Sequence, residues 1–158
     1  MSHQRIRFGG SGGGYPLFAS TNVKFPGCSA VLAGDIVYLT GATGVTLGGK
    51  SFVGDGDPAA QAENAMLVIA NLLKESGASI RDICKVTTYV TDHAYRAEVY
   101  PVIAKHLKGV YPCSTGLVVN GLARPEFDFE IDVFTVIPKN DTPHCRFRTF
   151  NKNIPATG

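Results

Sequence analysis

Apolar and polar residues alternate along residues 127–136, which read Phe-Asp-Phe-Glu-Ile-Asp-Val-Phe-Thr-Val. A period of two residues is typical of a strand with one buried face. The face predicted to be buried comprises Phe127, Phe129, Ile131, Val133 and Thr135. The opposite face carries Asp128, Glu130 and Asp132. Two interpretations follow: a solvated acidic sheet face, or a polar cleft in which Glu130 serves as an acid/base or as a substrate anchor.

Three other stretches predict strands. Two short apolar runs, 29–33 and 36–40, lie on either side of Gly34-Asp35, a pair typical of the tight turn in a β-hairpin. Residues 83–91 are rich in β-branched side chains, which favours a strand. Residues 111–120 contain a further apolar run that precedes the alternating stretch.

Two helices are predicted between these strands. For the first, Asp57 is a favoured N-cap, Pro58 suits the first helical position, and Gly77 suits the residue after the last turn. Its inward stripe comprises Ala62, Ala65, Met66, Ile69, Leu72 and Leu73. The second helix is predicted to hold Pro101 in its first turn and to run to about Lys108, because proline is tolerated in a first turn but not deep inside a helix. Its inward residues are predicted to be Val99, Val102, Ile103 and Leu107.

The resulting order, β-β-α-β-α-β-β, indicates an α+β fold in which two helices pack on one face of a mixed sheet. The pattern predicts no third helix for the other face, and an uncovered apolar sheet surface would be exposed to water. We therefore expect copies of the chain to assemble, with the acidic strand at a sheet edge facing a hollow that the copies share.

Length and composition are those of one globular domain: 158 residues, 44% hydrophobic and 18% charged. No apolar run reaches the roughly 18 residues of a membrane span, so no membrane partner is expected. The first residues contain no apolar signal region, which predicts a cytoplasmic protein. The four cysteines are widely spaced and are predicted to be free thiols. The four histidines show no metal-ligand spacing, and neither a metal nor a cofactor is expected.

Charge is unevenly distributed along the chain. Residues 1–24 are Gly-rich, which predicts a flexible extension, and they carry three basic residues and no acidic one. Residues 139–158 form a second basic extension, with four basic residues and one acidic residue. The domain between them, 25–138, carries eight basic and twelve acidic residues, which disfavours a nucleic-acid-binding surface. The basic ends either pack on this acidic body, or on that of a neighbouring subunit, or fray.

Several short motifs resemble a known family. Tyr-Pro-Cys-Ser-Thr at 111–115 is followed by an apolar strand, a loop containing leucine, and Phe-Glu-Ile-Asp at 129–132. Three upstream segments also resemble segments of that family and follow one another in the same order: residues 34–41, 75–79 and 82–92. Together these motifs resemble the RidA (YjgF/L-PSP) family. The resemblance implies a chorismate-mutase-like fold and a homotrimer with three small-molecule clefts between its subunits.

The resemblance also implies chemistry and site residues. Family members hydrolyse enamines and imines to ketones or keto acids and ammonia, a reaction in which Glu130 would orient water or relay a proton. The active deaminases carry an arginine that pairs with the substrate carboxylate, and the matching residue here is Ser114, so the chain resembles a divergent member without the usual cleft arginine. The predicted substrate-binding residues are Gly41, Cys113, Ser114, Thr115, Gly116 and Arg124. Arg124 is either a replacement cation or a solvent-exposed loop residue.

Two functions of different classes remain. The first is a hydrolase that deaminates an imine, an enamine or a related small nitrogen compound, and the second is a trimeric small-molecule binding or accessory protein without catalysis. Ribonuclease action, a label attached to the family, has no support from a histidine pair or a basic patch. A reactive Cys113 would need a histidine or a helix N-terminus beside it, so a small buried thiol is the expectation. The substrate itself is not predicted.

Overall fold

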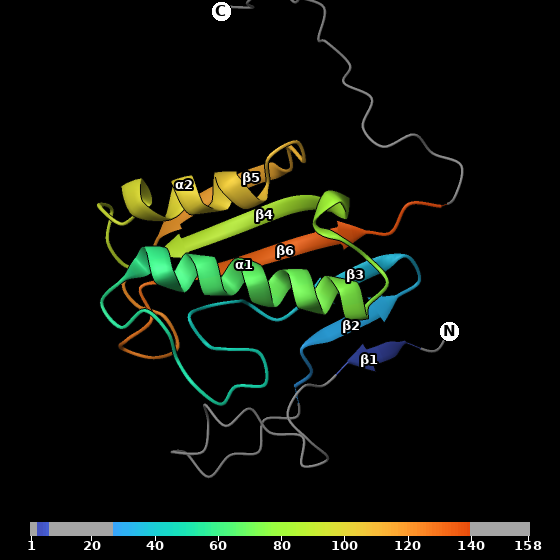
Figure 1. Ribbon diagram of the computed structural model, residues 1–158, viewed down its shortest axis with the longest axis horizontal. Helices are drawn as coiled ribbons and strands as arrows, with labels where there is room; N and C mark the ends of the chain where they lie inside the picture. Colours follow the sequence, from blue (N-terminus) through green and yellow to red (C-terminus); the bar gives the residue numbers. More distant parts are fainter. Residues whose placement is uncertain (1–2, 7–26, 140–158) are drawn as a thin grey trace, which may run out of the picture.

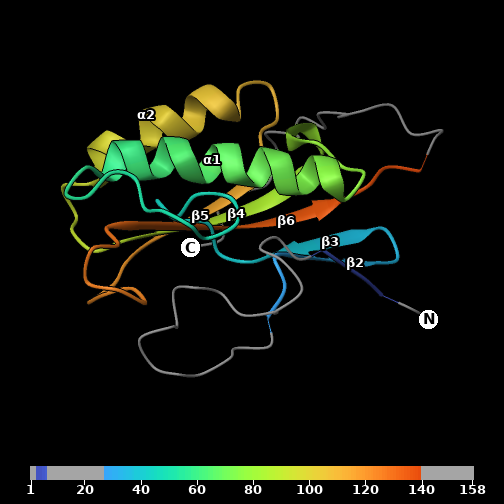
Figure 2. The ribbon, with the colours of Figure 1, turned by 60° about the horizontal axis from the view of Figure 1, so that its bottom comes forward.

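Two helices cover one face of a six-stranded sheet, as the two views of the computed structural model show (Figures 1 and 2). The structure describes residues 3–6 and 27–139. The long helix α1 spans Pro58–Glu75, and α2 spans Arg96–His106. Within those described ranges no helix combines the length and apolar character needed to cross a membrane. The layered α+β arrangement predicted from the sequence is confirmed.

The sheet is mixed, with the strand order β1-β2-β3-β6-β4-β5. Its strands are β1 (Gln4–Ile6), β2 (Ala30–Ala33), β3 (Ile36–Leu39), β4 (Ile83–Val90), β5 (Cys113–Val118) and β6 (Phe129–Val136). The pair β4–β5 is parallel, and the other four pairs are antiparallel. The α2 crossover joins the two parallel strands, because a parallel pair cannot be closed by a short hairpin.

The alternating stretch forms β6, and its predicted buried face is confirmed. Residues 127, 129, 131, 133 and 135 are all buried, and they pack beneath the helices. The strand lies between β3 and β4 in the interior of the sheet, so its predicted position at a sheet edge was wrong. Alternation reports how many faces of a strand are buried, whereas an edge or interior position depends on which strands pair with it.

Helix α1 begins and ends as predicted. The Ala60 N–H donates to Asp57 Oδ1 at 2.9 Å, Pro58 occupies the first position, and Gly77 follows the last turn with a φ of 78°. The stripe along this helix contacts the sheet to form the main core. The core comprises Val37, Ala42, Ala62, Ala65, Met66, Ile69, Leu73, Ile83, Val86, Val90, Val99, Ile103, Leu107, Phe129, Ile131 and Val133.

Helix α2 begins at Arg96, earlier than predicted, so Pro101 lies inside the helix and not in its first turn. The turn before the helix is set by Asp92, whose Oδ1 accepts a hydrogen bond from the Ala94 N–H at 2.7 Å. Proline removes the hydrogen bond to the carbonyl four residues back, at Ala97. Both Pro101 and Ala97 are exposed, so water can satisfy that carbonyl and the helix tolerates the proline.

The sheet face away from the helices carries exposed aromatic side chains. Tyr38 on β3 is 43% exposed and Phe134 on β6 is 50% exposed, and their rings meet edge to face with centroids 5.6 Å apart. Val136 on the same face is also exposed. Glu130 and Asp132 share this face of β6 with Phe134, because alternate residues of a strand point the same way.

The N-terminal strand β1 is an addition to the predicted elements. Its residues pair antiparallel with β2, with Arg5 opposite Val31. Three residues reading Gln-Arg-Ile show no period that a sequence pattern can reveal. Residues 7–24 and 140–158 of the two predicted extensions lie outside the described residues, as does Cys145.

Candidate functional site

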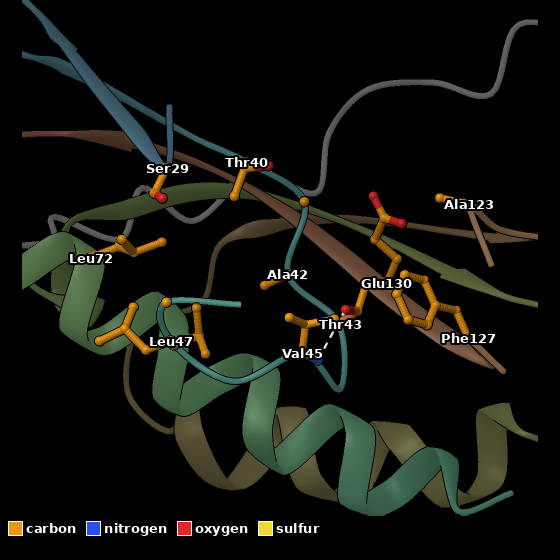
Figure 3. Close-up of a pocket in the computed structure, with 13 residues that line it drawn as sticks. Ser29, Thr40, Ala42, Thr43, Val45, Leu47, Leu72, Ala123, Phe127 and Glu130 are labelled. Atoms are coloured by element: carbon orange, nitrogen blue, oxygen red, sulfur yellow. Dashed lines mark hydrogen bonds between the residues drawn. The ribbon is translucent and has the colours of Figure 1, made fainter. Parts of the chain in front are cut away.

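A cavity of about 230 Å³ lies between the start of β6, the segment after β3 and helix α1. Figure 3 shows the side chains that line it, with Glu130 on β6 and Leu72 on the helix. The lining comprises Ser29, Thr40, Gly41, Ala42, Thr43, Val45, Leu47, Gly48, Val68, Leu72, Ala123, Phe127 and Glu130. The cavity thus combines mainly apolar walls with a few hydroxyl groups and one carboxylate.

Glu130 is the ionisable group of this lining, and it is half-buried. Burial raises its pKa above the ordinary value of 4.5, and the negative charge of Asp132 raises it further. Among the described residues, no side chain or backbone group donates a hydrogen bond to its carboxylate. A carboxyl group in this setting holds its proton closer to neutral pH and can exchange it with a ligand.

Gly41 lies directly against Glu130. A Cβ atom at Gly41 would overlap Glu130 Oε1 and would lie 2.9 Å from Glu130 Cδ and 3.2 Å from Asp132 Oδ1. The approach is held by a pair of backbone hydrogen bonds between Ala42 and Ile131, of 3.0 and 2.9 Å. The structure therefore brings together Gly41 and Glu130, two of the residues predicted for the site, and a side chain at position 41 would displace the Glu130 carboxyl group.

Asp132 is held in place by a tyrosine on the neighbouring strand. Tyr89 Oη donates to Asp132 Oδ2 at 3.1 Å, and Tyr89 is the cross-strand partner of Glu130. Burial is the main cause that raises the pKa of Tyr89, and the hydrogen bond to Asp132 adds to it. This hydrogen bond holds the Asp132 side chain beside Glu130.

The predicted residues on β5 divide between the two faces of the sheet. Thr115 lies on the open face, where its Oγ1 accepts a hydrogen bond from Lys85 Nζ at 2.6 Å, and Cys113 lies opposite Lys85. Gly116 lies on the helix side, where an added Cβ would overlap the Tyr100 hydroxyl. By alternation, Ser114 shares the helix side with Gly116.

Within one subunit, β5 is separated from β6 by β4, which places the two strands about 10 Å apart. The structure thus does not bring the four residues from Cys113 to Gly116 into the cavity with Glu130. The expectation of a buried thiol was wrong for Cys113, which is exposed because the edge strand β5 is exposed along its whole length.

Arg124 lies next to the cavity but does not line it. Its guanidinium forms an ion pair with Glu126 and lies over the Phe127 ring, 5.6 Å from the centroid. Its charge is therefore already balanced by Glu126.

Two polar residues of α1 form hydrogen bonds to the segments around the cavity, and neither was among the residues predicted for the site. Gln61 is fully buried: its Oε1 accepts from the N–H groups of Asp128 (2.9 Å) and Phe129 (3.2 Å), and its Nε2 donates to the Gly54 and Glu126 carbonyls and to Asp128 Oδ2. Asn64 Nδ2 donates to the carbonyls of residues 43 and 45, at 3.0 and 2.9 Å. The available signal was a polar residue in phase with the apolar stripe.

The family model described as endoribonuclease L-PSP matches residues 25–137. A member of the YjgF/YER057c/UK114 family from Mycobacterium tuberculosis is 26% identical, with a TM-score of 0.69 over 86% of this chain and 100% of that chain. Yeast Mmf1 is 22% identical, with a TM-score of 0.70 over 87% of this chain and 100% of that chain. A Pseudomonas aeruginosa protein of unknown function is 22% identical, with a TM-score of 0.68 over 93% of this chain and 99% of that chain. No curated protein matched.

Proposed function

The chain belongs to the endoribonuclease L-PSP family, also called YjgF or RidA, and from this premise we propose that it deaminates a small imine, enamine or related nitrogen compound by hydrolysis. The reaction takes place in clefts between the subunits of a homotrimer, and each cleft includes the cavity around Glu130. Glu130 is the acid/base, and the backbone at Gly41 forms the wall beside it.

The observation that carries this proposal is the Glu130 carboxyl group. It is half-buried in a cavity, its pKa is raised, and no described residue donates a hydrogen bond to it. Hydrolytic deamination requires a proton for the enamine carbon and then a positioned water that adds to the resulting iminium carbon. The C–N bond breaks and ammonia leaves, so one carboxyl group that first donates and then accepts a proton is sufficient.

The exposed sheet face supports the assembly. Tyr38, Phe134 and Val136 present apolar surface on the same face as Glu130, and an apolar patch of this kind on a sheet marks an interface. When other subunits cover this face, they also enclose the space in front of Glu130. Trimeric mass in light scattering is expected, and a stable single subunit would contradict this part of the proposal.

Ammonia release tests the activity. A short-lived enamine is generated in the presence of the wild-type protein, of Glu130→Gln, and of Glu75→Gln as the matched control at an exposed end of α1. We expect the wild type and Glu75→Gln to accelerate ammonia release equally. The rate of release with Glu130→Gln is expected to be about 10²–10⁴-fold lower, which is the usual contribution of a general acid/base. Equal rates for all three proteins would refute the role of Glu130.

A second candidate is a trimeric binding or accessory protein without catalysis. The observation that favours it is that Glu130 is the single ionisable side chain of the cavity lining, so no second acid or base assists it. Saturable ligand binding to the wild type, without turnover of any imine or enamine, would decide for this candidate. The lining contains no histidine, lysine or arginine, which weighs against the RNA cleavage that the family description names.

A further inference from the structure

The cavity has an unbalanced charge. Of the 13 residues that line it, Glu130 alone is ionisable, and Asp132 lies beside it on the same face of β6. The remaining walls are apolar or carry hydroxyl groups. A ligand in this space therefore meets a negative electrostatic potential that the lining itself does not neutralise.

Two basic side chains of the described structure are already engaged elsewhere. Arg124 is paired with Glu126 and lies over the Phe127 ring. Lys85 donates to Thr115 and lies four residues before Tyr89 on β4, about 13 Å along the strand from the partner of Glu130. Neither side chain is placed to pair with a ligand carboxylate beside Glu130.

We propose that this cavity selects nitrogen compounds that are neutral or cationic near the reacting nitrogen, and discriminates against those with a carboxylate on the adjacent carbon. The proposal rests on the proposed function for the reaction itself. A cationic iminium gains from the Glu130 carboxylate, whereas a carboxylate substrate is repelled by it and by Asp132. The step balances: an iminium ion and one water give a carbonyl compound and an ammonium ion.

The shape of the cavity also limits the ligand. Its volume of about 230 Å³ is smaller than the roughly 300–1,000 Å³ of sites for drug-sized molecules. Val45, Leu47, Leu72 and Phe127 provide apolar contacts for a short aliphatic group. The expected ligand class is a small aliphatic imine, amine or amide.

Two imines of matched size test the selection. A flavin oxidase generates in situ either a branched 2-imino acid or its 2-imino amide, and ammonia release is followed with and without the protein. We expect kcat/KM for the amide to exceed that for the acid by about tenfold or more, since one unfavourable charge contact is relieved. Equal or preferential turnover of the acid would overturn this inference and leave the proposed deaminase standing.

Measurements of ligand binding test the charge selection independently of the proposed catalysis. If neither imine is turned over, the deaminase fails, and calorimetric titration of isobutyramide against isobutyrate decides the charge selection. Tighter binding of the amide supports it, and equal or reversed affinities overturn it. With Glu130→Gln we expect the preference to fall at least severalfold, whereas Glu75→Gln retains it. A preference unchanged in Glu130→Gln would show that this carboxylate is not its source.

Discussion

Replacing Gln61 by leucine tests whether α1 positions the site. The buried amide joins three segments: the loop at Gly54, the loop at Glu126 and the start of β6 at Asp128 and Phe129. Leucine has a similar volume but neither donates nor accepts hydrogen bonds. The substitution therefore removes the polar contacts without opening a large cavity.

The magnitude follows from the groups that lose their partners. The Asp128 and Phe129 N–H groups lose their shared acceptor, and a buried unsatisfied group costs about 1–3 kcal/mol. The Gly54 carbonyl keeps a second donor, the Asp57 N–H at 3.0 Å, so it adds little. We expect a net loss of about 2–4 kcal/mol in the free energy of unfolding after the gain from burying leucine. For a chain of this length that lowers Tm by about 4–16 °C.

Thermal melts monitored by circular dichroism, together with urea titrations, measure this loss. The matched control is Asn71→Leu, which removes an amide at an exposed position of the same helix, where Asn71 Nδ2 donates to the Leu67 carbonyl. We expect the control to melt within about 2 °C of the wild type, because exposed substitutions usually change stability by no more than about 0.5 kcal/mol. A Gln61→Leu protein that melts with the control would refute the assignment of this network.

Three further predictions follow from the site and the open face. For Glu130, the folded state holds the proton more tightly than the unfolded state, so stability is retained at low pH and is lost as pH rises from 4.5 through the raised pKa. Glu130→Gln should therefore be more stable than the wild type at pH 7, with the difference disappearing below about pH 4 in urea titrations; a constant difference would contradict the raised pKa. Gly41→Ala should weaken ligand binding by about tenfold or more in calorimetry, because its Cβ overlaps Glu130 Oε1. Gly121→Ala, which meets no atom within 4 Å, should bind as the wild type does, and equal affinities for both variants would refute the close approach. Phe134→Asp should yield single subunits in light scattering, whereas Leu67→Asp on α1 should remain assembled, and an intact trimer of Phe134→Asp would exclude the open face as the interface.

Local signals in the sequence were sufficient for most of the fold. The alternation along 127–136 identified the buried face of β6, and Asp57 and Gly77 identified the ends of α1. The turn at Gly34 was also predicted, and its φ of 68° is one that glycine adopts readily. Each of these properties is decided by residues close together in the chain. The start of α2 was missed, because the exposure that makes Pro101 tolerable is not visible in the local pattern.

Only the tertiary structure decided how the predicted site residues are grouped. Gly41 and Glu130 are 89 positions apart in sequence, yet they are in contact because the segment after β3 pairs with β6. The residues of β5 were predicted for the same site, but alternation divides them between two faces, and the register of β5 on β4 decides which pair faces the helices. A one-residue change in register would exchange those faces, so spacing along the chain alone does not determine them.

The charge properties of Glu130 also depend partly on the local sequence and partly on the tertiary structure. The sequence alone placed three carboxylates on one face of a strand. The structure keeps Glu130 and Asp132 on one face of β6, whereas Asp128 lies before the strand and accepts a hydrogen bond from Gln61 of α1. The raised pKa depends mainly on burial, to which the segment near residue 41, distant in the chain, contributes together with the loop before β6. Loss of water around a charge is a property of the assembled surroundings, so it is decided only when the chain has folded.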